Sequence, residues 1–132
     1  MCTSSAFPLP VIALAAALSA ASSAGAQSPV PVTDARQLLI AAIDAPDGQA
    51  HGVLTGELAD AITKRFQAST PIHVDVSTER RYLQDGCRRL KVTFWQDGVR
   101  LPDTAAVRRQ RIDFGINFCR DRQPPRSLKE AP

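Results

Sequence analysis

Hydrophobic residues recur at helical spacing in two segments of the first half of the chain. One segment runs from Asp34 to Asp44 and the other from Thr55 to Gln67, and both predict amphipathic helices. The apolar faces of the two segments are Leu38, Leu39, Ala42 and Ile43, then Leu54, Leu58, Ile62 and Phe66. Between them, residues 45–52 (APDGQAHG) have the composition of a turn-rich loop.

The second half of the chain alternates between apolar and polar residues, which predicts strands with one buried face. The predicted strands cover residues 72–77, 88–96 and 111–120. We expect Asp97-Gly98 to end the second of them and residues 103–109 to add a short helical turn before the third. The residues expected to face the core are Ile72, Val74, Val76, Leu90, Val92, Phe94, Ile112, Phe114, Ile116 and Phe118.

The last two predicted strands can pair antiparallel in a register that satisfies their apolar rows and their cysteines together. When paired positions sum to 206, Cys87 lies opposite Cys119, and a slip by one residue would turn one apolar row toward solvent. The same register places Trp95 beside Arg111, where the two side chains could make a cation–π contact. The opposed apolar pairs are Leu90–Ile116, Val92–Phe114 and Phe94–Ile112. The sequence therefore predicts a disulfide that joins the two strands.

These elements predict one α+β domain over residues 33–122. We expect two helices packed on one face of a three-stranded antiparallel meander sheet, with one disulfide. Residues 27–32 form an extended, Pro-containing lead-in, and residues 123–132 form a flexible, basic, Pro-containing tail.

The first 26 residues have the pattern of a secretory signal peptide. An apolar run from Val11 to Ala21 precedes small residues that end at Ala26, and the run is too short to span a bilayer. A disordered Ala/Ser-rich tail is the alternative interpretation. Removal of this segment would also remove Cys2 and leave Cys87 and Cys119, an even number that indicates a disulfide in an exported protein. We therefore expect a periplasmic or secreted protein with no stable membrane insertion after cleavage.

Charge is distributed unevenly along the 132 residues. Residues 27–79 contain three basic and seven acidic side chains, whereas residues 80–126 contain twelve basic and five acidic ones. Arginine dominates the second group, and it favours bidentate contacts with carboxylates or phosphates. The candidate contacts for an anionic or protein partner are Arg80, Arg81, Tyr82, Arg88, Arg89, Trp95, Arg108, Arg109 and Arg111. The alternative is that these residues form a solvated exterior that offsets the acidic half.

The sequence shows no catalytic or metal-binding pattern. His73 shares a strand face with Asp75, but no third ligand is apparent for a metal, and His51 lies in the predicted loop with no nucleophile at a fixed spacing. GVLTG before the second helix could offer backbone amides to an anion, as many such loops do. We expect no cofactor, no metal and no enzymatic activity.

The stretches GCRRLKVTFWQDGV and INFCRDRQPPRSL resemble small exported proteobacterial proteins carried near conjugation and type IV secretion genes. The resemblance covers the second half of the chain and implies a non-catalytic accessory of envelope or transfer machinery. The leading hypothesis is thus an exported binding protein whose partner is another envelope protein. The alternatives are a binder of an anionic polymer, such as DNA or a cell-wall polymer, and a small hydrolase that uses His51 or His73.

Overall fold

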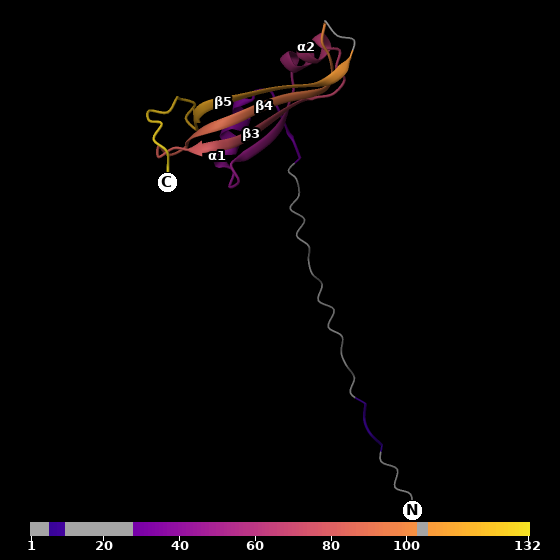
Figure 1. Ribbon diagram of the computed structural model, residues 1–132, viewed down its shortest axis with the longest axis vertical. Coiled ribbons are helices and arrows are strands. Elements are labelled where there is room, and N and C mark those ends of the chain that lie inside the picture. The colour runs from indigo at the N-terminus through magenta and orange to yellow at the C-terminus, as the bar shows by residue number, and fades with distance from the viewer. Residues whose placement is uncertain (1–5, 10–27, 103–105) are drawn as a thin grey trace, which may run out of the picture.

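A five-stranded sheet with two helices forms the folded part of the protein (Figure 1). The computed structural model describes residues 6–9, 28–102 and 106–132. The strands lie side by side in their order along the chain, with β1 parallel to β2 and every other pair antiparallel. The elements in chain order are β1 (Val30–Val32), α1 (Arg36–Asp44), β2 (Gln49–Leu54), α2 (Glu57–Arg65), β3 (Ile72–Arg81), β4 (Cys87–Arg100) and β5 (Val107–Cys119).

The structure confirms the α+β class, the two helices and the disulfide, but the predicted three-stranded antiparallel sheet is wrong. The two additional strands are β1, within the predicted lead-in, and β2, most of which lies in the predicted loop. The small residues Ala50 and Gly52 of β2 give almost no alternation of hydrophobicity to recognise. β1 is three residues long and contains Pro31, which an edge strand tolerates because only one side of it is paired.

The register predicted for the last two strands is confirmed. Cys87 lies opposite Cys119, and the three expected apolar pairs face one another across β4 and β5. Both strands are longer than predicted, because a register shift between Gln96 and Val99 carries the hairpin past Asp97-Gly98. Gly98 has a φ of 67°, which glycine adopts without strain. Residues 107–109 begin β5 instead of forming a helical turn, and residues 103–105 lie outside the described residues.

The main core lies between α1 and one face of the sheet. Leu38, Leu39, Ala42 and Ile43 of α1 are all buried, as their spacing predicted. They pack against apolar residues of the sheet, namely Val32, Ala50, Val74, Val76, Leu90, Val92 and Phe118. The helix approaches β2 so closely that a Cβ at Gly52 would lie 2.6 Å from Leu38 Cδ1 and 2.8 Å from the carbonyl oxygen of Val30.

Helix α2 lies on the same side of the sheet as α1 but packs much less closely. Ala59 is its one buried residue, and Leu58 is 70% exposed although it belongs to the predicted apolar face. Polar contacts fasten this region to β4, since Gln96 Nε2 donates to Thr63 Oγ1 at 3.0 Å and to the carbonyl of Thr70 at 2.8 Å. The helical spacing predicted the direction of the apolar face but not how deeply the helix would dock.

The two faces of the sheet are therefore different. We call the side that carries α1 and α2 the helix face. We call the opposite side the open face, because no helix of the described residues covers it. Ile112 and Phe114 point to the helix face, as predicted, but they are 59% and 45% exposed. They belong to β5, the strand at the edge of the sheet, where neither helix covers them fully.

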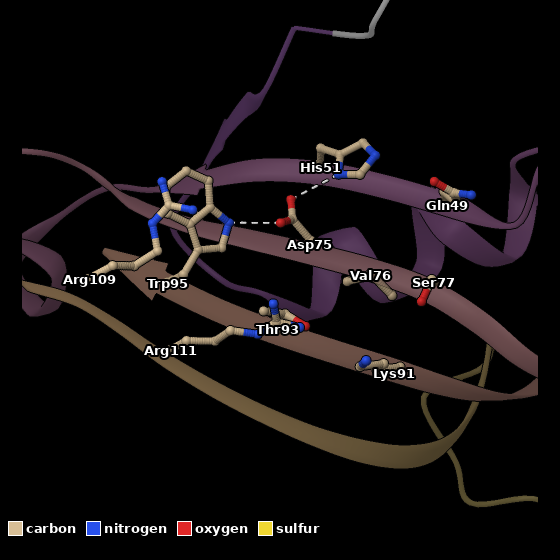
Figure 2. A pocket seen from close by; sticks show the side chains of 10 residues that line it. All are labelled: Gln49, His51, Asp75, Val76, Ser77, Lys91, Thr93, Trp95, Arg109 and Arg111. Carbon is tan, nitrogen blue, oxygen red and sulfur yellow. Dashed lines mark hydrogen bonds and ion pairs between the residues drawn. The ribbon is translucent and has the colours of Figure 1, made fainter. Parts of the chain in front are cut away.

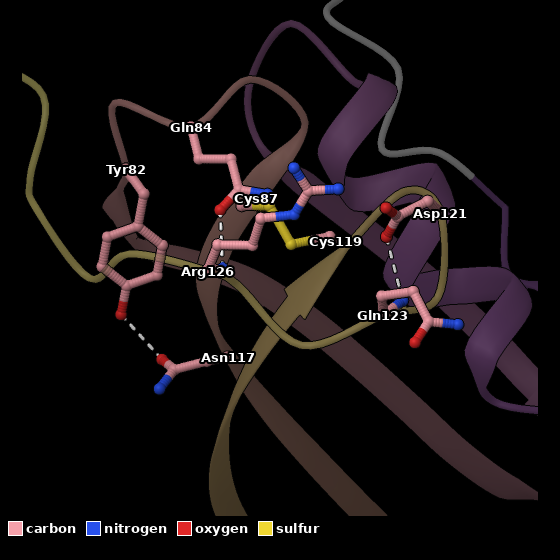
Figure 3. Close-up of a disulfide and its surroundings, with 8 residues drawn as sticks. All are labelled: Tyr82, Gln84, Cys87, Asn117, Cys119, Asp121, Gln123 and Arg126. Atoms are coloured by element: carbon pink, nitrogen blue, oxygen red, sulfur yellow. Dashed lines mark hydrogen bonds between the residues drawn. A yellow bond between two sulfur atoms is a disulfide. The ribbon is translucent and has the colours of Figure 1, made fainter.

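One end of the sheet is closed by the disulfide and by the C-terminal segment (Figure 3). Cys87 and Cys119 form a small buried cluster with Tyr82, whose hydroxyl donates to Asn117 Oδ1 at 2.7 Å. The backbone of residues 129–131 then runs beside the end of β3, with Leu83 N donating to the Lys129 carbonyl at 2.8 Å. This part of the predicted tail thus packs on the domain, which the sequence pattern did not indicate.

The predicted signal peptide lies outside the described residues, apart from residues 6–9, which form no regular structure. Within the described ranges, no helix has the length and apolar character required to cross a bilayer.

Candidate functional site

A shallow pocket of about 360 Å³ lies on the open face of the sheet (Figure 2). It crosses four neighbouring strands, β2 to β5, so its lining residues are far apart in the sequence. Apart from Val76, which is buried in the core on the helix face, the lining residues alternate along each strand and point to the pocket, because successive side chains of a strand lie on opposite faces. The lining residues are Gln49, His51, Asp75, Val76, Ser77, Lys91, Thr93, Trp95, Arg109 and Arg111.

Trp95 lies between two side chains from the neighbouring strands. The ring of His73 on β3 stacks on the indole with centroids 3.8 Å apart and an interplanar angle of 6°. The guanidinium carbon of Arg109 on β5 lies 4.4 Å from the indole centroid. Arg111 is opposite Trp95 in the register, as predicted, but the cation–π contact is made by Arg109, its diagonal neighbour. The sequence register identified the right strand and the wrong arginine.

Asp75 connects Trp95 to His51. The indole Nε1–H donates to Asp75 Oδ2 at 2.7 Å, and His51 Nδ1 lies 2.9 Å from Asp75 Oδ1 (Figure 2). Since a carboxylate can only accept, Nδ1 carries the hydrogen in this contact. His51 reaches Asp75 because β2 pairs with β3 and places the two residues opposite one another. The sequence pattern does not reveal this contact, because it predicts a loop at His51.

Two arginine–aspartate pairs fix the β5 side of the pocket. Arg109 binds both carboxylate oxygens of Asp97, at 2.6 and 3.0 Å, and Arg111 binds both oxygens of Asp113, at 2.9 and 3.1 Å. The hydrogen bonds from Arg109 lower the pKa of Asp97, and those from Arg111 and then from Thr93 lower the pKa of Asp113. The same contacts raise the pKa of each arginine. Both arginines on the β5 side of Trp95 are therefore paired with carboxylates of the protein itself.

The residues predicted as partner contacts separate into two groups at opposite ends of the β4–β5 hairpin. Trp95, Arg109 and Arg111 lie at the open-face pocket, whereas Arg108 is exposed on the helix face beside them. The other group lies near the disulfide and contains Arg80, Arg81, Tyr82, Arg88 and Arg89. The register predicted for the hairpin already implies this separation, because it places Trp95 beside Arg111 and keeps Arg88 and Arg89 next to the disulfide.

The arginines near the disulfide are mostly engaged with the protein. Arg80 Nη1 lies 3.1 Å from Glu130 Oε1, and Arg89 Nε lies 3.7 Å from Glu79 Oε2. Arg88 is half-buried against α1, where its Nη1 donates to the Ala42 carbonyl at 3.4 Å. Burial lowers the pKa of Arg88, and the nearby charges of Arg81 and Arg120 lower it further.

The side chains of the open-face pocket are held by contacts with one another, and the described residues do not assemble a catalytic or metal-binding group there. His51 has the carboxylate partner of a general base, but no hydroxyl hydrogen-bonds to it among the described residues, and Asp75 also binds Trp95. The described part of the chain contains no group of three or more potential metal ligands. What the pocket presents is the Trp95 ring, three cationic side chains, the His51–Asp75 pair, two hydroxyl groups and one side-chain amide.

Comparisons of the chain with protein-family models, with curated proteins and with solved structures found no significant match.

Proposed function

We propose that the protein is an exported, non-catalytic binding protein of the bacterial envelope and that another envelope protein binds its open face. The observation that carries this proposal is the ladder His73–Trp95–Arg109 toward the turn end of the β4–β5 hairpin on that face, stacked at 3.8 Å and 4.4 Å. Tryptophan and arginine are, together with tyrosine, enriched at binding hot spots.

The ladder is ordered before any partner arrives. Both faces of the Trp95 ring are in contact, its Nε1–H is hydrogen-bonded to Asp75, and Arg109 is bound to Asp97 by two hydrogen bonds. Side chains that are already fixed lose less conformational entropy on binding. A rigid, half-exposed aromatic and cationic surface therefore suits a folded protein partner.

Two features support export. The Cys87–Cys119 disulfide is typical of proteins in oxidising compartments, and residues 1–26 have the pattern of a signal peptide. The resemblance of the second half to exported proteins encoded near conjugation genes suggests that the partner belongs to conjugative transfer machinery.

An anionic polymer is a weaker candidate for the partner. Four of the seven candidate arginines, namely Arg80, Arg89, Arg109 and Arg111, form ion pairs within the protein. The remaining cations lie at separate ends of the hairpin, so they do not make one continuous track. Binding to DNA that weakens steeply with added salt would favour this alternative.

A small hydrolase is the second candidate function, because the structure joins His51 to the carboxylate of Asp75. A hydrolase of this kind requires His51 to take a proton from water or from a hydroxyl group, with Asp75 orienting the imidazole. Ester or glycoside hydrolysis that His51→Ala abolishes and His73→Ala retains would establish this function and refute the non-catalytic proposal.

Affinity capture with matched arginine variants tests the binding function. The mature chain, immobilised and exposed to solubilised envelope proteins of its own host, should retain a specific protein. Arg109→Ala and Trp95→Ala should lose that protein, whereas Arg108→Ala, the neighbouring arginine on the helix face, should retain it. Equal capture by the Arg108 and Arg109 variants, or no specific capture by the unmodified chain, would refute binding through the open face.

A further inference from the structure

Strand β5 is a long sheet edge that the described residues leave unpaired. It has 13 residues, lies last in the strand order and contains no proline. Natural proteins usually protect such an edge with charged residues, proline or a covering segment. In β5 the charges are concentrated near its start, and between Ile112 and Phe118 Asp113 is the one charged residue.

The helix face beside this edge is apolar and open. Ile112 and Phe114 of β5 are 59% and 45% exposed, and Phe114 lies parallel to Phe94 with centroids 6.0 Å apart. Next to them is a groove of about 260 Å³ between α2 and the hairpin, whose lining includes Leu58, 70% exposed. From β5, the groove is lined by Gln110 and Ile112. The unpaired edge and the exposed apolar surface are thus continuous.

We propose that two copies of this chain pair antiparallel through β5, with Ile112 opposite Ile112 of the second copy. In a symmetric antiparallel pair, the apolar rows meet on one face only when paired positions sum to an even number, because side chains alternate along a strand. Three registers of this kind are centred at or between the exposed residues Ile112 and Phe114. Their two-fold axes pass through Ile112, Asp113 or Phe114.

Charge and groove geometry select the axis at Ile112. On the open face, this axis sets Arg111 opposite Asp113 of the second copy, twice, and each arginine–aspartate pair is attractive. An axis at Asp113 would set the two Asp113 carboxylates directly opposite one another, which is destabilising. The sequence Arg111-Ile112-Asp113 is therefore self-complementary about its central residue, which favours a second copy over an unrelated extended peptide.

The same axis also fills the apolar groove. With this axis, Phe114 of the second copy lies opposite Gln110 of the first, and the two Ile112 residues lie opposite one another. Gln110 and Ile112 line the groove, so Phe114 and Ile112 of the second copy lie at its mouth. An axis at Phe114 would instead bring Phe118 opposite Gln110, and Phe118 is already buried in its own core. One register thus covers the exposed apolar residues of both copies and joins the two sheets edge to edge.

Oligomeric state measured on matched variants tests the pairing. The mature chain should sediment as a dimer that Ile112→Lys converts to a monomer. Val30→Lys, which changes a residue of similar exposure (55%) on the opposite edge of the sheet, should leave the dimer intact. Circular dichroism should show that both variants are folded.

A chain that is monomeric at its highest soluble concentration, or a dimer that Ile112→Lys leaves intact, would overturn the proposal. A monomer that binds an extended peptide along β5 would overturn it in favour of that occupant.

Cysteine crosslinking tests the register separately from the affinity. With the axis at Ile112, two Ile112→Cys residues lie directly opposite one another, with Cα atoms about 4.5–5.5 Å apart, within reach of a disulfide. Two Phe114→Cys residues would be about 13 Å apart along the strands and could not crosslink. A disulfide-linked dimer from Ile112→Cys alone supports the register, whereas one from Phe114→Cys, or none from Ile112→Cys, overturns it. Since Ile112 and Phe114 lie on the helix face, failure of these tests leaves the open-face function unaffected.

Discussion

At the scale of single residues, Trp95 organises the open face. Its ring separates His73 from Arg109, and its Nε1–H fixes the carboxylate of Asp75, which in turn holds His51. These contacts come from four different strands, so one side chain aligns groups that the sequence keeps far apart.

Trp95→Phe should keep the stacked ring and remove the hydrogen bond to Asp75. The expected loss in the free energy of unfolding is about 0.5–1.5 kcal/mol, the usual net value of one hydrogen bond. Urea unfolding followed by circular dichroism measures it, since Trp95 is the single tryptophan of the chain and the variant lacks its fluorescence. A double-mutant cycle with Asp75→Ala should show non-additive losses, and strictly additive losses would mean that the bond contributes nothing.

Acid should destabilise the domain partly through Asp113. Its hydrogen bonds with Arg111 and Thr93 lower its pKa in the folded state, so the unfolded state binds more protons below about pH 4. Its contribution to stability is therefore present above the ordinary aspartate pKa and is lost as the pH falls through the lowered one. Asp113→Asn should make the fall in urea midpoint between about pH 5 and pH 3 less steep. Asp60→Asn, at an exposed residue with no ion pair in the described part of the chain, should not.

At the scale of elements, the β4–β5 hairpin could be predicted and β2 could not. A single register of the hairpin places its apolar residues opposite one another and Cys87 opposite Cys119. Few other pairings of the two strands were therefore compatible with the sequence. β2 is recognisable only from its partners, because Gly52 stands where Leu38 of α1 packs against the strand, so the apolar side chain that would mark a strand is missing there. Without β2, the His51–Asp75 contact of the candidate site could not be predicted either.

Gly52→Ala tests how closely α1 packs on β2. The new methyl group would meet Leu38 and the backbone oxygen of Val30 within 3 Å, so we expect a loss of about 1–3 kcal/mol in the free energy of unfolding. Gly115→Ala is the matched control in β5, since its Cβ would meet the flexible end of Arg89, which can move aside. Similar stability for the two variants would contradict the close helix–strand contact.

The disulfide should make a large contribution to the stability of this small domain. Cys87 and Cys119 are 32 residues apart in the sequence, for which the chain-entropy model gives about 3–4 kcal/mol. Replacing both cysteines with alanine should lower the free energy of unfolding of the mature chain by about this amount in urea titration. An unchanged urea midpoint would show that strand pairing alone holds this end of the sheet.

At the scale of the whole molecule, the fold places different surfaces on different sides. Both helices cover one face, which leaves an ordered polar pocket on the opposite face and, among the described residues, no strand paired with the outer edge of β5. Of the pocket residues, the sequence marked Trp95, Arg109 and Arg111 as candidate contacts, but it did not bring His51 to Asp75. The contact between His51 and Asp75 depends on β2, which the pattern of the sequence does not reveal.

The most direct test of the proposed function is photocrosslinking in living cells of the host. A photoreactive residue at Gln49, an exposed position that lines the open-face pocket, should crosslink to an envelope protein. The same residue at Ala61, exposed on α2 at the helix face, should not crosslink to that protein. Absence of a crosslink from Gln49, or the same crosslink from both positions, would contradict binding through the open face.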